Sequence, residues 1–206
     1  RERALRSEML QKLRRGCEHA LLSGAQGVCS ARVDADSFLI TPEGMDNALV
    51  EEGDLVLVRG GAAEAGKRPA RETPLHARIY ETHADVGAVF TAMPANAMAF
   101  ACSGQRFETS TVPESYYMLR AVPERPFGEF ALDPDSAAAR FAAGTPVVLF
   151  ENSRIVTTGA TLFTAFDRLE VAEATAASIL VAGDAGSVVY LSDGEIQALR
   201  TTFHLE

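Results

Sequence analysis

The sequence has no apolar run long enough to cross a membrane. Among its 206 residues, no stretch approaches the ~20 consecutive apolar residues that a spanning helix needs. No signal-peptide pattern stands ahead of the first helical pattern. These two absences predict a cytoplasmic protein that makes no membrane contact.

Cysteine and positive charge are both scarce. Cys17, Cys29 and Cys102 are three in number and widely spaced, which favours free thiols in a reducing compartment over a disulfide framework. The 19 lysines and arginines face 28 acidic residues, for a net charge of −9. Because nucleic-acid binding needs a basic face, no nucleic-acid partner is expected. The basic residues within positions 1–15 fit the polar side of a helix.

Histidine is scarce too, and its spacing does not indicate a metal site. The chain has His19, His76, His83 and His204, of which only His76 and His83 share a predicted helix, two turns apart. A phosphate-binding loop is also missing, because the glycine-containing stretch at residues 59–67 lacks the final Ser/Thr and the right glycine spacing. No arrangement of Ser-His-Asp or Cys-His type can be argued from the order of residues.

What the sequence does contain is an alternation of strand and helix patterns. Apolar residues make up 47% and charged residues 23%, as in ordinary globular proteins. The patterns predict strands within 37–46, 54–61, 86–92 and 145–159, the last stretch holding two strands joined by a turn at Asn152 and Ser153. Helices are predicted over 1–24, 74–84, 94–104, 133–144, 160–184 and 191–202, with a Pro-rich stretch of short extended pieces at 112–130. One α/β domain over residues 1–206 follows.

Four segments, in order, carry a resemblance to a known family. They are FLITPEGMD with the following DLVLV, GKRPARETPLHARIY, ADVGAVFTAMPANAMAF and GATLFTAFDRLEVAEATA. Together they resemble the class II aldolase/adducin family, of the L-fuculose-1-phosphate aldolase type, from about Gly27 to the end of the long helix. The resemblance implies an α/β/α sandwich with a largely antiparallel central sheet. It also implies a homo-oligomer, with a cyclic tetramer favoured and the site at a subunit boundary.

The resemblance fails at the metal site. Enzymes of the family hold zinc or another divalent metal with three histidines, two in a His-Thr-His-Pro motif and one in an Asn-His-Gly turn. These ligand positions fall on Thr91, Met93 and Ser153 in this chain. Two neutral hydroxyls and a thioether are a poor ligand set for zinc. We therefore expect no metal cofactor.

Two residues match catalytic positions of the family. Glu72 stands where the family carries its acid/base glutamate; the alternative is an exposed glutamate in the first turn of the helix that Pro74 begins. Tyr117 falls near a tyrosine that the fuculose-phosphate aldolases use as a proton donor; the alternative is an aromatic residue packed at a subunit contact. Both interpretations stay open for each residue.

The phosphate site of the family is altered as well. Its positions correspond to Gly27, Ser30 and Gly44, with Arg71 nearby as a group that attracts anions, whereas Glu43 would repel a phosphate. The alternative is that the basic residues at 67–71 form a solvated loop.

Arg154 is a charge gained beside the third ligand position. Its guanidinium could place a positive charge near the former cation and bind a carboxylate. Alternatively, Arg154 forms a structural ion pair with Glu151 or Glu72.

Three functions are compatible with this pattern. The first is a non-catalytic, metal-free relative of the sugar-phosphate aldolases, a pseudoenzyme in which the fold serves as a binding, scaffolding or regulatory module with a small anionic ligand or a protein partner. The second is a divergent, metal-independent lyase that uses Glu72, Tyr117 and Arg154 on a small carboxylated or polyol substrate. The third is an ordinary metal-dependent aldolase whose ligands come from other residues. The first explains the joint loss of metal ligands and phosphate contacts most simply.

Overall fold

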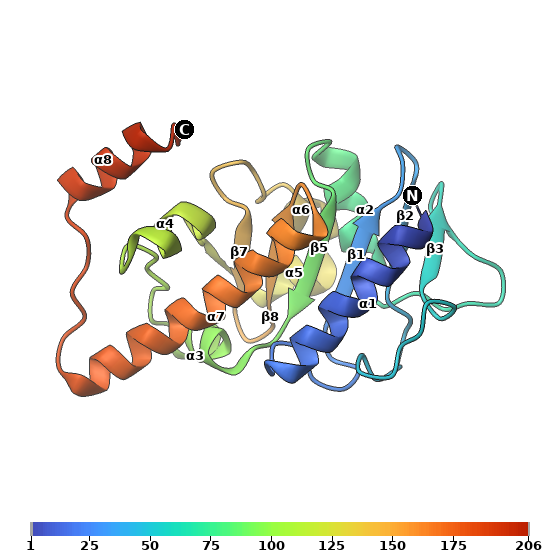
Figure 1. Cartoon of the computed structure of the whole chain (residues 1–206), viewed down its shortest axis with the longest axis horizontal. Coiled ribbons are helices and arrows are strands. Elements are labelled where there is room, and N and C mark those ends of the chain that lie inside the picture. Colours follow the sequence, from blue (N-terminus) through green and yellow to red (C-terminus); the bar gives the residue numbers. More distant parts are fainter. Residues whose placement is uncertain (1, 206) are drawn as a thin grey trace.

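The computed structural model describes residues 2–205, so Arg1, where the first helix was expected to begin, lies outside the described residues, as does Glu206. The described chain forms an eight-stranded sheet flanked by helices, with strand order β4-β3-β2-β1-β5-β8-β7-β6 (Figure 1). The strands are β1 (Val28–Arg32), β2 (Ser37–Ile40), β3 (Val56–Arg59), β4 (Ala62–Ala63), β5 (Ala88–Ala92), β6 (Glu124–Arg125), β7 (Val147–Phe150) and β8 (Arg154–Gly159). The helices are α1 (Glu2–Glu18), α2 (Thr73–Thr82), α3 (Ala95–Ser103), α4 (Pro113–Leu119), α5 (Phe127–Leu132), α6 (Pro134–Ala138), α7 (Leu162–Ala185) and α8 (Asp193–Thr202).

The sheet is antiparallel at every pairing except that of β6 with β7, which is parallel. Helices cover both of its faces, with α1 and α7 in front of the sheet and α2 behind it in Figure 1. The predicted α/β/α sandwich with a largely antiparallel sheet is confirmed. None of the helices within residues 2–205 is both long and apolar enough to cross a membrane.

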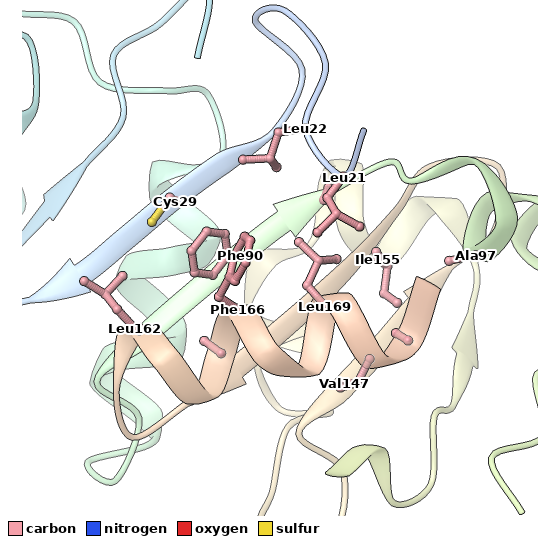
Figure 2. Packing of buried hydrophobic residues seen from close by; sticks show 14 of the residues in the cluster. Leu21, Leu22, Cys29, Phe90, Ala97, Val147, Ile155, Leu162, Phe166 and Leu169 are labelled. Atoms are coloured by element: carbon pink, nitrogen blue, oxygen red, sulfur yellow. The ribbon is translucent and has the colours of Figure 1, made fainter. Parts of the chain in front are cut away.

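The core consists of two apolar layers, one on each face of the sheet. On strand β5, Phe90 points toward α7, where its ring lies 5.4 Å from the ring of Phe166 (Figure 2). Val89, its neighbour in sequence, belongs to the layer on the α2 side together with Ile79. This alternation follows from the two-residue period of a strand. It places Thr91 on the α2 side as well, which matters for the site.

Several expected elements differ in the structure. The first helix ends at Glu18 rather than Gly24, because Ala20 adopts a positive φ of 56° and the turn that follows buries Leu21 and Leu22. The central strand β1 carries no apolar alternation in its sequence, VCSAR, and was not predicted.

The stretch 112–130 contains helices α4 and α5 in place of extended pieces. Pro113 is the first residue of α4, where a helix needs no amide donor. In contrast, the helix expected over 133–144 is only the short α6. Helix α8 begins as predicted, since Ser192 and Glu195 form a capping box.

Four neighbouring strands bring their ends together on one side of the sheet because they are antiparallel, and we call this side, where the strands begin or end, the edge. Strand β1 begins there, β2 and β5 end there, and β8 begins there, with Val28 opposite Thr91 and Thr91 opposite Val156. Helix α2 also begins nearby, since Ala70 donates its amide to Thr41 just beyond the end of β2. This edge gathers most of the residues that the sequence predicts for a site.

Candidate functional site

A small cleft opens at this edge of the sheet. Its volume is about 190 Å³, and Gly27, Gly44, Arg71, Glu72 and Arg154 all line it. We call it the edge cleft. Four of the five residues predicted to bind a ligand therefore lie together with the predicted acid/base glutamate.

Arg154 and Glu72 form an ion pair in the edge cleft. The distance from Arg154 Nη2 to Glu72 Oε1 is 3.3 Å, and the two side chains are 20% and 13% exposed. Arg154 is brought there by the tight turn between β7 and β8, in which Asn152 has a φ of 51°. Glu72 immediately precedes helix α2. The predicted pairing with Glu72 is the one observed, and Glu72 is not the exposed residue of the alternative interpretation.

The guanidinium of Arg154 keeps an unused hydrogen-bond donor. Among the described residues, Nη1 is buried and has no hydrogen-bond partner. The Cζ atom lies 5.7 Å from the centre of the Phe130 ring, so that ring contributes a cation–π contact. Leaving a buried donor unpaired costs about 1–3 kcal/mol. An acceptor that reaches this group would recover part of that cost.

A second ion pair lies at the rim. Arg71 Nε donates to Glu43 Oε1 at 2.8 Å, and this hydrogen bond lowers the pKa of Glu43. Arg71 itself is 86% exposed, so the pair is solvated and contributes little to stability. The edge cleft thus holds two arginines and two glutamates, and a phosphate that approached Arg71 would meet the carboxylate of Glu43.

Ser30 does not line the edge cleft. It is fully buried and belongs to a chain of polar side chains on the α2 side of the sheet. Its Oγ lies 2.8 Å from Tyr80 Oη and 2.7 Å from His76 Nδ1, and His76 Nε2 lies 2.8 Å from Thr91 Oγ1. We call these four residues, Tyr80, Ser30, His76 and Thr91, the buried polar chain.

His76 is the centre of the buried polar chain and was not predicted to be part of the site. Burial lowers its pKa to about 3, so the imidazole is neutral and offers one donor and one acceptor. The sequence held a signal, because His76 and Tyr80 are four residues apart and therefore share a helix face with the apolar Ile79 beside them. The imidazole satisfies both hydroxyls that it contacts.

The three positions that the resemblance assigns to metal ligands do not offer a set of free ligand groups. The hydroxyl of Thr91 is fully buried and bonded to His76. Met93 is 38% exposed just beyond β5, and Ser153 is buried in the turn before β8. Within residues 2–205, no three His, Cys, Asp or Glu side chains are grouped to hold a metal ion.

Tyr117 lies outside the edge cleft of its own chain. It stands on α4, which packs against α7, and its ring is 5.0 Å from the ring of Phe203 near the C-terminus. The side chain is 40% exposed. This chain alone does not bring Tyr117 to Glu72.

Comparison with known proteins identifies the family. Residues 7–180 match the family described as the class II aldolase and adducin N-terminal domain. The chain belongs to this family. YgbL from Escherichia coli superposes on it with a TM-score of 0.89 at 25% identity, covering 97% of this chain and 99% of YgbL. An L-fuculose 1-phosphate aldolase superposes with a TM-score of 0.79 at 25% identity, covering 97% of this chain and 95% of that protein.

Curated relatives match over shorter stretches. The methylthioribulose-1-phosphate dehydratase of Acidiphilium cryptum is 35% identical over 99 residues, which are 47% of this chain and 46% of the dehydratase. The enzyme of the same name from Sodalis glossinidius is 40% identical over 65 residues, 31% of this chain and 32% of that enzyme. The matches therefore span about half the length, or less, of these relatives.

The chain is a class II aldolase/adducin family member, but the side chains of Thr91, Met93 and Ser153 do not fit a zinc ion. Thr91 offers a neutral hydroxyl that is already bonded, and Met93 and Ser153 offer a thioether and a second hydroxyl. Zinc in proteins is held by thiolate, imidazole and carboxylate groups. We derive no catalytic step through a metal at these positions. The third hypothesis, a metal-dependent aldolase with other ligands, finds no ligand group in the described part of the chain.

Proposed function

We propose that this chain is a class II aldolase-fold protein that binds a small anionic ligand at Arg154 without a divalent cation. The observation that carries the proposal is the guanidinium of Arg154, which stands in the edge cleft with Nη1 buried and unpaired among the described residues. Arginine binds carboxylates through two parallel hydrogen bonds, and its charge does not depend on pH in the ordinary range. A carboxylate that forms two hydrogen bonds with this guanidinium would use the unpaired Nη1 and would replace part of the contact that Nη2 now makes with Glu72.

The same arrangement argues against the metal-dependent chemistry of the family. A divalent cation stabilises the charge that develops beside a carbonyl by several kcal/mol. Because ~1.4 kcal/mol corresponds to a tenfold change in rate, losing that stabilisation removes several powers of ten from carbon–carbon cleavage. A single arginine that is already paired with Glu72 does not replace a divalent ion. Binding without such turnover is the function that these residues support best.

NMR titration tests the binding function directly. Acetate, as the smallest carboxylate probe, is expected to shift the Nε–H resonance of Arg154 saturably, with a dissociation constant of about 1 mM. Protein that has first been dialysed against EDTA and then against EDTA-free buffer should give the same titration. The Arg154→Lys variant, which cannot present two parallel donors, should bind acetate about tenfold more weakly.

The control is Arg68→Lys, because Arg68 is an exposed arginine that does not line the edge cleft. This variant should bind acetate as the wild type does. Acetate binding that needs added zinc, or that Arg154→Lys leaves unchanged, would overturn the proposal.

A metal-independent lyase is the second candidate. It is favoured by the curated relatives, which are named dehydratases, and by Glu72, which lines the edge cleft where a proton acceptor would be needed. Turnover of methylthioribulose 1-phosphate in the presence of EDTA, abolished by Glu72→Gln, would support it over the binding function. Three further points stay predictions. They are a homo-oligomer, a role of Tyr117 as a proton donor at the subunit boundary of that oligomer, and a protein partner.

A further inference from the structure

A second, larger cleft borders the same charged residues. It has a volume of about 360 Å³ and shares Arg71, Glu72 and Arg154 with the edge cleft. Its other walls are apolar, and we call it the apolar cleft. These walls are Pro74, Leu75, Phe130, Ala131 and Pro134. Cavities of this size, mostly apolar with a few polar groups, are typical of small-molecule sites.

The two clefts differ in the charged residues that line them. Glu43 lines the edge cleft but not the apolar cleft, so the edge cleft holds two arginines and two glutamates. The apolar cleft is lined by two arginines and one glutamate, but Arg71 is paired with Glu43 and Arg154 with Glu72, so its open donor among the described residues is Nη1 of Arg154. A single carboxylate matches this one donor, whereas a phosphate dianion would bring a second negative charge beside Glu72 with no free cation among the described lining residues to meet it.

The wall formed by α5 is fixed before any ligand arrives. Glu129 accepts from Arg140 Nε at 2.9 Å and from Arg140 Nη2 at 3.0 Å, and it also pairs with Arg125. These two arginines lower the pKa of Glu129 to about 2, so the carboxylate stays ionised. The next residue, Phe130, packs its ring 5.3 Å from that of Phe150 in the core. A preformed wall spares a ligand the entropy loss of ordering it.

We propose that the ligand is a monocarboxylate that carries an apolar group, such as an aromatic ring or a short alkyl chain. The inference rests on the proposed function, since Arg154 must hold the carboxylate. The apolar group then lies between Pro74 and Leu75 on one side and Phe130 on the other. Phe130, which already contacts the guanidinium, connects the charged end of the ligand to the apolar end. A sugar phosphate, which is polar and doubly charged, fits this cleft poorly.

Calorimetric titration with phenylacetate, acetate and inorganic phosphate tests the inference. Phenylacetate is expected to bind at least about tenfold more tightly than acetate, because its ring leaves water for the apolar cleft. Phosphate is expected to bind more weakly than phenylacetate. The Ala131→Trp variant fills the cleft from an exposed position, so it should remove the advantage of phenylacetate over acetate.

Two variants complete the design. Ala139→Trp places the same bulk at an exposed alanine outside the cleft and should bind phenylacetate as the wild type does. Phe130→Ala removes the wall and should reduce phenylacetate affinity even if Ala131→Trp folds poorly.

The outcomes separate the two proposals. If acetate binds through Arg154 but phenylacetate binds no more tightly, or if both cleft variants retain the advantage, this inference is overturned and the proposed function stands. If neither carboxylate binds, both proposals are overturned.

Discussion

Replacing Arg154 with methionine is expected to lower the free energy of unfolding by about 2–3 kcal/mol. The variant leaves the carboxylate of Glu72, whose side chain is 13% exposed, without its ion-pair partner. A buried charge that has lost its partner is strongly destabilising, whereas the intact pair contributes little net stability. The residual exposure of both side chains, and the nearby charge of Arg71, bring the expected effect slightly below the ~3–5 kcal/mol typical of fully buried pairs. Urea denaturation at pH 7 measures the change.

A double-mutant cycle isolates the ion pair from other effects. Glu72→Gln alone should also destabilise the protein, because Arg154 then keeps a buried charge with a neutral neighbour. The combination of Glu72→Gln with Arg154→Met, which has neither charge, should lie within about 1 kcal/mol of the wild type. Purely additive losses would show that the two residues do not act as a pair in solution.

Replacing His76 with alanine is expected to lower the free energy of unfolding by about 3 kcal/mol, the second large effect. The change removes a fully buried ring and leaves a cavity beneath the sheet. It also leaves the hydroxyls of Ser30 and Thr91 without the imidazole that each now contacts. Ser30 retains Tyr80 as a partner, so Thr91 carries most of the hydrogen-bond loss.

His76 also gives the protein a characteristic pH dependence. Its pKa is lowered by burial from 6.5 to about 3, so between these values only the unfolded chain takes up a proton. The stability is therefore fully present above pH 6.5 and falls by as much as ~1.4 kcal/mol per pH unit below it. Denaturation of the wild type at pH 7, 6 and 5 should show this slope, and His76→Gln, which cannot titrate, should be nearly flat over the same range.

The pH window also provides the control. Glu129, whose pKa is lowered to about 2 from 4.5, loses its stabilising pairs only as the pH falls below 4.5, outside the window used for His76. Thr91→Val should keep the slope of the wild type, because the imidazole stays buried. A slope that persists in His76→Gln would show that another group is responsible.

The sequence predicts much of the frame because its patterns are local. The alternation of strands and helices indicated one α/β domain, and the resemblance to the family implied the sandwich. The strand pair around Asn152 followed from a turn between two apolar runs. Strand β1 could not be recognised because its buried face includes Ser30, whose partner His76 lies 46 residues away. Apolar periodicity does not reveal a strand whose inward side chains are polar and satisfied by another element.

The candidate site was predictable only in part, for the same reason. The resemblance placed Glu72 and Arg154 in one neighbourhood, and the structure pairs them. The second cleft depends on α5, most of which lies in the stretch that the sequence pattern indicated as extended, so the wall formed by Phe130 could not be anticipated. Ser30 was predicted to bind a ligand but is buried. Its partners His76 and Tyr80 are distant in the sequence, so the sequence pattern did not indicate these contacts.

The zinc content of the purified protein tests the central claim most directly. After dialysis against EDTA and then against buffer that contains zinc, elemental analysis should find far less than one zinc per chain. The hydroxyls of Thr91 and Ser153 and the thioether of Met93 are expected to hold none. One tightly bound zinc per chain that is lost on replacing Thr91 and Ser153 with alanine would contradict the account.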